Sequence, residues 1–190
     1  MIKIGVIGTG GMGNWHADAY SKISDVKIVA CSDVVEENRK KFAEKWKVSN
    51  VYSDYNEMFK KEKLDGVSNV TPDGIHKDVA IAALKNGVPI LSEKPLAKNL
   101  ADAKKMYQLA KKSKVINMVN FSYRKSSGLQ EAAKAIAMGK IGRIIHVEAS
   151  YLQSWLSSKY WGDWSKETTW LWRLSTKHGF CFLWKSWQRT

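Results

Sequence analysis

The amino-acid sequence predicts an α/β fold, with a Rossmann-type, doubly wound parallel sheet over residues 1–120. Two observations carry this prediction. Short apolar segments alternate with amphipathic segments of helical length, as expected for repeated strand–helix units. A glycine-rich turn also separates the first apolar segment from the first helical one. We therefore expect residues 1–120 to form one domain and residues 121–190 to belong to another.

The predicted strands are the short apolar segments, whose composition is typical of strands buried on both faces. They span residues 2–7, 26–32, 65–70, 88–92 and 115–120. Helices are expected over residues 12–23, 35–47, 54–61, 75–86 and 100–113. Right-handed crossovers bring the carboxyl ends of all parallel strands to one edge of the sheet, which is where such folds bind ligands.

The sequence changes in character after residue 120. It predicts a helix over 127–138 and a half-buried strand over 143–152, where apolar and polar side chains alternate. Seven of the nine tryptophans lie within 155–187. The tail 180–190 is rich in large aromatic residues and has no clear period, so we expect it to be atypical.

The turn after the first predicted strand has the pattern G-x-G-x-x-G. Gly8 permits a tight turn, Gly10 lets the backbone approach a pyrophosphate, and Gly13 lets the following helix pack closely. The helix N-terminus then offers free N–H groups and a positive dipole to phosphate. The candidate cofactor-binding residues of this turn are Gly8, Thr9, Gly10, Gly11, Met12 and Gly13.

Asp33 follows the second predicted strand, 20 residues after Gly13. A carboxylate there can accept both hydroxyls of an adenosine ribose and repels a 2′-phosphate, which favours NAD over NADP. Ser32 and Arg39 are close enough in sequence to keep NADP open. The alternative without a cofactor is a structural glycine turn with Asp33 as a helix cap.

Glu93, Lys94 and Pro95 follow the strand predicted over 88–92, so they lie at the ligand edge of the sheet. A lysine there would meet the nicotinamide end of a dinucleotide. It could take a proton from a substrate hydroxyl, or donate a hydrogen bond to the substrate oxygen. The alternative is an exposed loop lysine in a lysine-rich chain.

Thr71, Pro72 and His76 form a comparable loop at the same edge. Thr71 ends a predicted strand, and His76 lies in the first turn of the next helix. His76 could contact cofactor or substrate, and a capping or packing role is equally open.

The net charge of +13 raises the question of nucleic-acid binding. The lysines are spread through helical segments and mixed with acidic residues, which indicates solvated helix faces. No apolar run approaches the roughly 18 residues needed to span a bilayer, and no signal peptide is evident. Two cysteines give no disulfide framework, so we expect a cytoplasmic protein that binds no membrane, nucleic acid or metal.

Together these residues resemble the Gfo/Idh/MocA oxidoreductase family, which includes glucose-fructose oxidoreductase and inositol dehydrogenases. The resemblance runs from residue 1 to about residue 179. The matching residues are the glycine turn with His16, Ser32 and Asp33, Thr71, Pro72 and His76, Glu93 to Ala97, Asn120 and Arg124, Gly139 to Gly142, and Trp172 and Arg173.

The resemblance implies an NAD(P)-dependent oxidoreductase that transfers hydride between nicotinamide and a sugar, cyclitol or related polyol. It implies a second α/β domain with a mainly antiparallel sheet, often used to form homo-oligomers. Lys94 matches the catalytic lysine, and the cofactor-binding set extends to Asp33, Thr71, Pro72, His76, Glu93, Lys94 and Asn120. Lys94, Arg124, Trp172 and Arg173 would contact the substrate.

The match breaks near the end of the chain. Family members continue through a glycine-rich stretch into an Asp-x-Gly-x-His motif, but no Asp follows Asp163 and no His follows His178 here. We therefore expect an incomplete second domain over 121–190, and a chain that binds cofactor better than it turns over substrate. A frameshift near residue 180 is one hypothesis for the tail. The alternative function is a non-catalytic dinucleotide-binding sensor or regulator.

Overall fold

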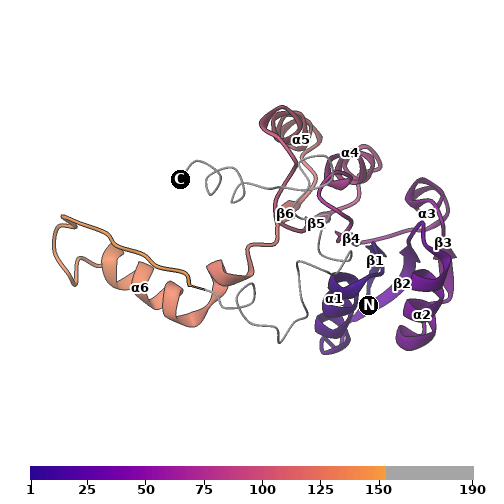
Figure 1. Cartoon of the computed structure of the whole chain (residues 1–190), viewed down its shortest axis with the longest axis horizontal. Helices are drawn as coiled ribbons and strands as arrows, with labels where there is room; N and C mark the ends of the chain where they lie inside the picture. Colours follow the sequence, from indigo (N-terminus) through magenta and orange to yellow (C-terminus); the bar gives the residue numbers. More distant parts are fainter. Residues whose placement is uncertain (153–190) are drawn as a thin grey trace, which may run out of the picture. The chain divides into compact units, whose positions relative to one another are not determined.

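The computed structural model describes residues 1–152, which fall into two compact units, Met1–Asn120 and the residues from Phe121 onward (Figure 1). The strands of the first unit are β1 (Ile2–Ile7), β2 (Val26–Ser32), β3 (Asn50–Tyr52), β4 (Gly66–Asn69), β5 (Ile90–Ser92) and β6 (Asn117–Val119). Its helices are α1 (Gly11–Ser21), α2 (Glu36–Trp46), α3 (Tyr55–Lys61), α4 (His76–Lys85) and α5 (Leu100–Ser113).

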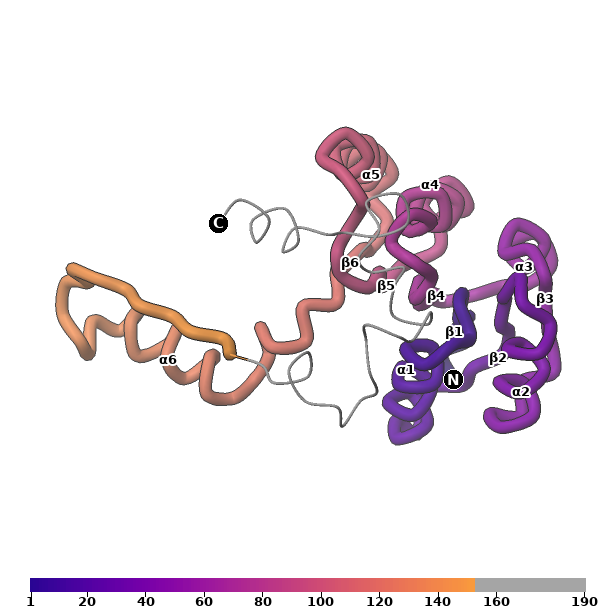
Figure 2. The backbone as a smooth tube through the Cα atoms, viewed as in Figure 1, coloured from indigo at the N-terminus to yellow at the C-terminus, as the bar shows by residue number. Residues whose placement is uncertain are grey.

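All six strands of the first unit pair in parallel, in the order β3-β2-β1-β4-β5-β6 (Figure 2). This is the strand order of the six-stranded Rossmann sheet, so the predicted fold is confirmed. The order reverses between β1 and β4. In open sheets of this kind, the crevice outside the carboxyl ends of the strands at this switch point is where ligands bind.

Helices cover both faces of the sheet, and each face has its own apolar core. Val6 packs with Phe42 in a core shared with α1 and α2. Its neighbour Ile7 packs on the opposite face with Met58 and Met106, in a core shared with α3, α4 and α5. Because successive side chains of a strand point to opposite faces, β1 is apolar throughout its buried half and fixes the centre of the sheet.

The structure confirms every strand and helix predicted for residues 1–120, with differences of a few residues at their ends. It adds β3, which the sequence did not indicate. β3 has three residues, lies at the edge of the sheet, and pairs only with β2 among the described strands. A strand this short and half-buried carries no readable hydrophobic period.

The second unit contains a short 3₁₀ helix, η1 (Ser122–Lys125), and helix α6 (Ser127–Ala137), which confirms the helix predicted over 127–138. The strand predicted over 143–152 is wrong, because this segment forms no strand in the structure. A strand needs a neighbour to pair with, and residues 1–152 offer none there. Ile145 and Val147 are exposed instead. The expected antiparallel sheet stays untested, since residues 153–190 lie outside the described part.

Candidate functional site

The glycine turn joins β1 to α1 at the switch point of the sheet. Gly8 has a φ of +94°, and a Cβ there would lie 2.6 Å from the carbonyl oxygen of Val70. A Cβ on Gly13 would lie 2.2 Å from the carbonyl oxygen of Gly8. A Cβ on Gly10 would meet no atom within 4 Å. Gly8 and Gly13 are therefore required by the protein's own packing, whereas Gly10 leaves open space in front of the backbone.

The N-terminus of α1 faces this open space without a side-chain cap. Its N-cap residue is Gly10, and the first turn carries no acidic side chain. Gly10, Gly11 and Met12 are all exposed, so the first backbone N–H groups of the helix can reach a ligand. Such an end, with its positive dipole, suits the pyrophosphate of a dinucleotide.

Two residues outside the G-x-G-x-x-G pattern hold this turn in place. The Asn14 side-chain amide donates to the carbonyl oxygens of Thr9 (3.3 Å) and Gly10 (3.0 Å). The Trp46 indole N–H donates in turn to Asn14 Oδ1 at 2.9 Å. Trp46 lies at the end of α2, so the helix that follows β2 secures the turn that follows β1.

Asp33 lies against the glycine turn, one residue beyond β2. Thr9 donates its backbone N–H (2.7 Å) and its hydroxyl (2.9 Å) to Asp33 Oδ2, and Val35 donates its N–H to Oδ1 at 2.9 Å. Oδ2 thus accepts two hydrogen bonds, and Oδ1, which accepts one, keeps acceptor capacity for a further donor. Arg39 is engaged elsewhere, because its guanidinium donates to the carbonyl oxygens of Asp33 and Val34.

His76 ties together the two loops that follow β4 and β5. The ring is 1 % exposed, with Nδ1 at 2.7 Å from the Pro95 carbonyl oxygen and Nε2 at 2.8 Å from the Thr71 carbonyl oxygen. The Thr71 hydroxyl donates to Asn69 Oδ1 at 2.7 Å. Both ring nitrogens of His76 thus contact backbone carbonyl oxygens. The ring links the two loops, and neither nitrogen is free to contact a ligand. Pro72 is exposed in the same loop.

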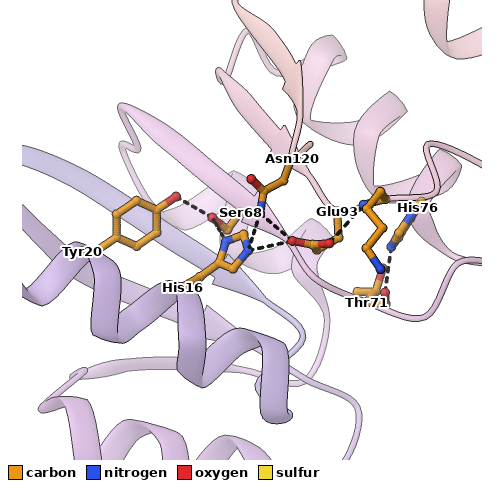
Figure 3. A network of polar contacts seen from close by, with 8 residues as sticks. His16, Tyr20, Ser68, Thr71, His76, Glu93 and Asn120 are labelled. Carbon is orange, nitrogen blue, oxygen red and sulfur yellow. Dashed lines mark hydrogen bonds and ion pairs between the residues drawn. The ribbon is translucent and has the colours of Figure 1, made fainter. Parts of the chain in front are cut away.

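A buried polar network lies between α1, β4 and the loop after β5 (Figure 3). His16, on α1, contacts Glu93 Oε1 through Nε2 at 3.1 Å and Ser68 Oγ through Nδ1 at 3.1 Å. The Tyr20 hydroxyl lies 2.6 Å from Ser68 Oγ. Asn120, directly after β6, donates its side-chain N–H to Glu93 Oε1 at 2.6 Å. The network therefore joins the phosphate-facing helix to the loop that carries Lys94.

Glu93 is the acceptor at the centre of this network and is only 7 % exposed. Burial by itself raises the pKa of a carboxyl group, but hydrogen bonds from His16, Asn120 and the Lys94 backbone N–H outweigh it. The net result is a pKa of Glu93 below its ordinary value. Its side chain is turned into the network, and its predicted contact with the cofactor stays a prediction.

Lys94 is exposed beside this network, and Asn120 is half-buried. Arg124 belongs to the second unit, in η1, and Trp172 and Arg173 lie outside the described residues. The structure thus brings the glycine turn, Asp33, Thr71, His76, Glu93, Lys94 and Asn120 to the same edge of the sheet. The site residues predicted from the sequence did not include Ser68, Tyr20, Asn14 or Trp46.

Residues 1–152 contain no group of three or more His, Cys, Asp or Glu side chains arranged to hold a metal ion. Within the same range, no helix is both long and apolar enough to cross a bilayer.

The sheet order, the uncapped helix after a glycine turn and the carboxylate beside it define a dinucleotide-binding Rossmann protein. Comparison with known families identifies the particular one. Residues 2–121 match the model of the Gfo/Idh/MocA family, described as an oxidoreductase family with an NAD-binding Rossmann fold, and the chain belongs to this family. The match favours the oxidoreductase prediction over a non-catalytic sensor.

Individual relatives agree with this assignment. The chain is 32 % identical over 164 residues to levoglucosan dehydrogenase of Pseudarthrobacter phenanthrenivorans, covering 81 % of this chain and 42 % of that protein. It is 33 % identical over 142 residues to myo-inositol 2-dehydrogenase of Thermotoga maritima, and the match covers 75 % of this chain and 42 % of that protein.

Among solved structures, scyllo-inositol dehydrogenase of Lactobacillus casei with bound NAD(H) and scyllo-inositol superimposes with a TM-score of 0.72. That pair is 28 % identical, and the superposition covers 76 % of this chain and 43 % of the other. The chain spans about two fifths of the length of the relatives it matches.

Proposed function

We propose that the protein is an NAD-dependent dehydrogenase of a polyol or sugar and that Lys94 is its catalytic residue. The observation that carries the proposal is the position of Lys94. It follows the carboxyl end of β5, at the same sheet edge as the glycine turn, in a chain of an NAD-binding oxidoreductase family. The named activities of the relatives, on levoglucosan and inositols, support a CH–OH substrate.

Each part of the edge has a separate task in this proposal. The first N–H groups of α1 hold the pyrophosphate, and Asp33 accepts the hydroxyls of the adenosine ribose. A bound nicotinamide supplies hydride transfer. Lys94 takes the proton from the substrate hydroxyl or donates to its oxygen, which lowers the barrier to removing hydride from the same carbon.

The geometry around Asp33 supports NAD over NADP. Three hydrogen bonds from Thr9 and Val35 hold the carboxylate in a fixed direction, where it would repel a 2′-phosphate. Arg39, the cation that could receive that phosphate, is bound to two carbonyl oxygens and lies 3.8 Å from Glu36. We therefore expect NADH to bind at least tenfold more tightly than NADPH, on the order of one unfavourable charge contact.

Fluorescence titration of the chain with NADH and NADPH tests the nucleotide part of the proposal. Lys94→Met should lose only a small part of the NADH affinity, because Lys94 is predicted to contact the nicotinamide end and not the pyrophosphate or the adenosine ribose. Formation of NADH from NAD⁺ with myo-inositol or glucose tests the chemical part. We expect the wild type to turn over slowly, because its second domain is expected to be incomplete, and Lys94→Met should abolish the turnover that remains. Failure of the wild type to bind NADH would overturn the whole proposal. Turnover that survives in Lys94→Met would overturn only the role of Lys94.

The location, oligomeric state and partners of the protein can be tested separately. We infer a cytoplasmic protein that binds no nucleic acid and that forms a homo-oligomer when its second domain is complete. Light scattering of a form with a complete second domain should give a mass above that of one copy. Titration with double-stranded DNA at low and high salt should show no strongly salt-dependent binding, which a nucleic-acid-binding protein of this charge would display.

A further inference from the structure

The buried carboxylate of Glu93 has no lysine or arginine partner among the described residues, and its nearest ring partner is His16. Its partners are the His16 ring, the Asn120 amide and the Lys94 backbone N–H. Within residues 1–152, no lysine or arginine side chain forms an ion pair with it. Hydrogen bonds from neutral donors keep a carboxylate ionised without cancelling its field.

The network is fully satisfied with a neutral His16 ring. In the neutral tautomer that satisfies these contacts, the ring carries its proton on Nε2, facing Glu93, and its Nδ1 accepts from the Ser68 hydroxyl. Ser68 Oγ in turn accepts from the hydroxyl of Tyr20, whose pKa is raised by burial despite the Ser68 contact, so Tyr20 keeps its proton. Every polar atom then has a partner, and the cluster holds one net negative charge.

Glu93 and Asp33 lie on opposite sides of the switch point, and Asp33 is the residue proposed to bind the adenosine ribose. Asp33 follows β2, on one side of the switch point, whereas Glu93 follows β5, on the other. A dinucleotide with its adenosine ribose at Asp33 and its pyrophosphate at α1 would place its nicotinamide toward β4 and β5. The inference rests on the proposed function in this respect.

We propose that Glu93 sets the redox preference of the bound cofactor by stabilising the positive nicotinamide ring of NAD⁺ over the neutral ring of NADH. Low-dielectric surroundings make a single charge effective over several ångströms. The carboxylate is turned into the network and acts through its field rather than through contact with the cofactor. A site of this kind releases NADH more readily than NAD⁺, which suits a dehydrogenase that works in the direction of oxidation.

The test compares the dissociation constants of NAD⁺ and NADH for the wild type and for Glu93→Gln, measured by calorimetry on the 190-residue chain. The glutamine keeps the shape and an acceptor oxygen but removes the charge. We expect the ratio of the NAD⁺ constant to the NADH constant to rise roughly tenfold, the scale of one charge at a protein-like dielectric. A purely structural role would weaken both ligands equally and leave the ratio unchanged, which would overturn the proposal.

Two further variants separate charge from geometry. Glu93→Asp keeps the charge while disturbing the hydrogen bonds, so the ratio should stay within about threefold of the wild type even where both affinities fall. Glu57→Gln removes a carboxylate from α3, on the exposed surface, and should leave the ratio unchanged. If Glu57→Gln changed the ratio as much as Glu93→Gln does, the effect would depend only on the net charge of the protein, which would contradict the proposal.

The wild type alone provides a second measurement, in case Glu93→Gln does not fold. Circular dichroism checks the fold of each variant. We expect wild-type NAD⁺ to bind no more weakly than NADH at neutral pH. An NADH affinity more than tenfold above that of NAD⁺ would overturn the role of Glu93. Absence of binding by either form would instead overturn the proposed function, so the two failures are distinguishable.

Discussion

The two ends of the ligand edge are built in different ways. The glycine turn is built from backbone atoms, and close packing at Gly8 and Gly13 fixes the path of the chain. The Lys94 end is held by buried side chains from elements far apart in the sequence, which form the network of His16, Glu93 and Asn120. The first end is specified by steric exclusion, and the second by complete hydrogen-bond satisfaction. We therefore expect mutations to damage the first through shape and the second through charge and pH.

The largest effect is expected for Gly13→Ala. The new Cβ would lie 2.2 Å from the Gly8 carbonyl oxygen, and this contact can be relieved only by moving α1 away from the turn. We expect a loss of at least about 3 kcal/mol in the free energy of unfolding, measured with urea. Gly128→Ala on α6 is the control, because its Cβ meets nothing within 4 Å. Equal stability of the two variants would contradict the steric account.

Removing the central charge of the network should have the next largest effect. Glu93→Gln should cost about 1–3 kcal/mol at neutral pH, because a glutamine cannot match every donor that the carboxylate accepts. The folded-state pKa of Glu93 is lowered, so its contribution is complete above the ordinary value of 4.5 and is lost as the pH falls through the lowered folded value.

Urea unfolding at a series of acidic pH values measures this contribution. The stability difference between wild type and Glu93→Gln should shrink as the pH falls below 4.5. A difference that stays constant across this range would show that ionisation of Glu93 contributes nothing to folding. Glu57→Gln gives the scale of a surface ion pair: Lys60 and Lys61 also lower the pKa of Glu57, so its difference should change in the same direction but remain smaller.

Gly10→Ala should separate binding from folding. Its Cβ fits the protein, since no atom lies within 4 Å, but it would occupy the space in front of the α1 N-terminus. We expect NADH affinity to fall about tenfold or more while the free energy of unfolding changes by less than about 1 kcal/mol. Unchanged NADH affinity would show that the pyrophosphate does not approach this backbone.

The smallest effect is expected for Trp46→Phe. The phenyl ring keeps most of the packing but loses the 2.9 Å hydrogen bond to Asn14 Oδ1. We expect a loss of about 0.5–1.5 kcal/mol in stability and a two- to threefold loss in NADH affinity, of the order of one hydrogen bond. Asn14→Ala should cost no less than this, because it also removes the bonds to Thr9 and Gly10.

Local patterns predicted the Rossmann sheet and the glycine turn because their causes are local. A φ of +94° requires a glycine at position 8, and an apolar run predicts a buried strand wherever it occurs. The segment 143–152 shows the limit of such patterns, because alternation alone does not supply a pairing partner. The absence of β3 from the prediction has a related cause, since a short edge strand is defined by its neighbour β2 rather than by its own composition.

The network escaped prediction because its members are far apart in sequence. His16 and Glu93 are separated by 77 residues, and His16 and Asn120 by 104. Ser68 lies inside an apolar segment and gives no signal of its own. The position of His16, one turn beyond the glycines and on the side of α1 that faces β4, was the one sequence feature that could have pointed to a buried partner.

The separation of these contacts also constrains how the molecule is made. Asn120 directly follows β6, which pairs with β5 and is the last strand of this sheet in the chain. The glycine turn, β2 and Asp33 are synthesised some ninety residues earlier, as estimated from their order in the chain. Long-range parallel pairing is slow, because the chain loses loop-closure entropy before the stabilising contacts form. The residues proposed to hold the pyrophosphate are therefore synthesised well before Asn120, the last member of the network that surrounds Glu93.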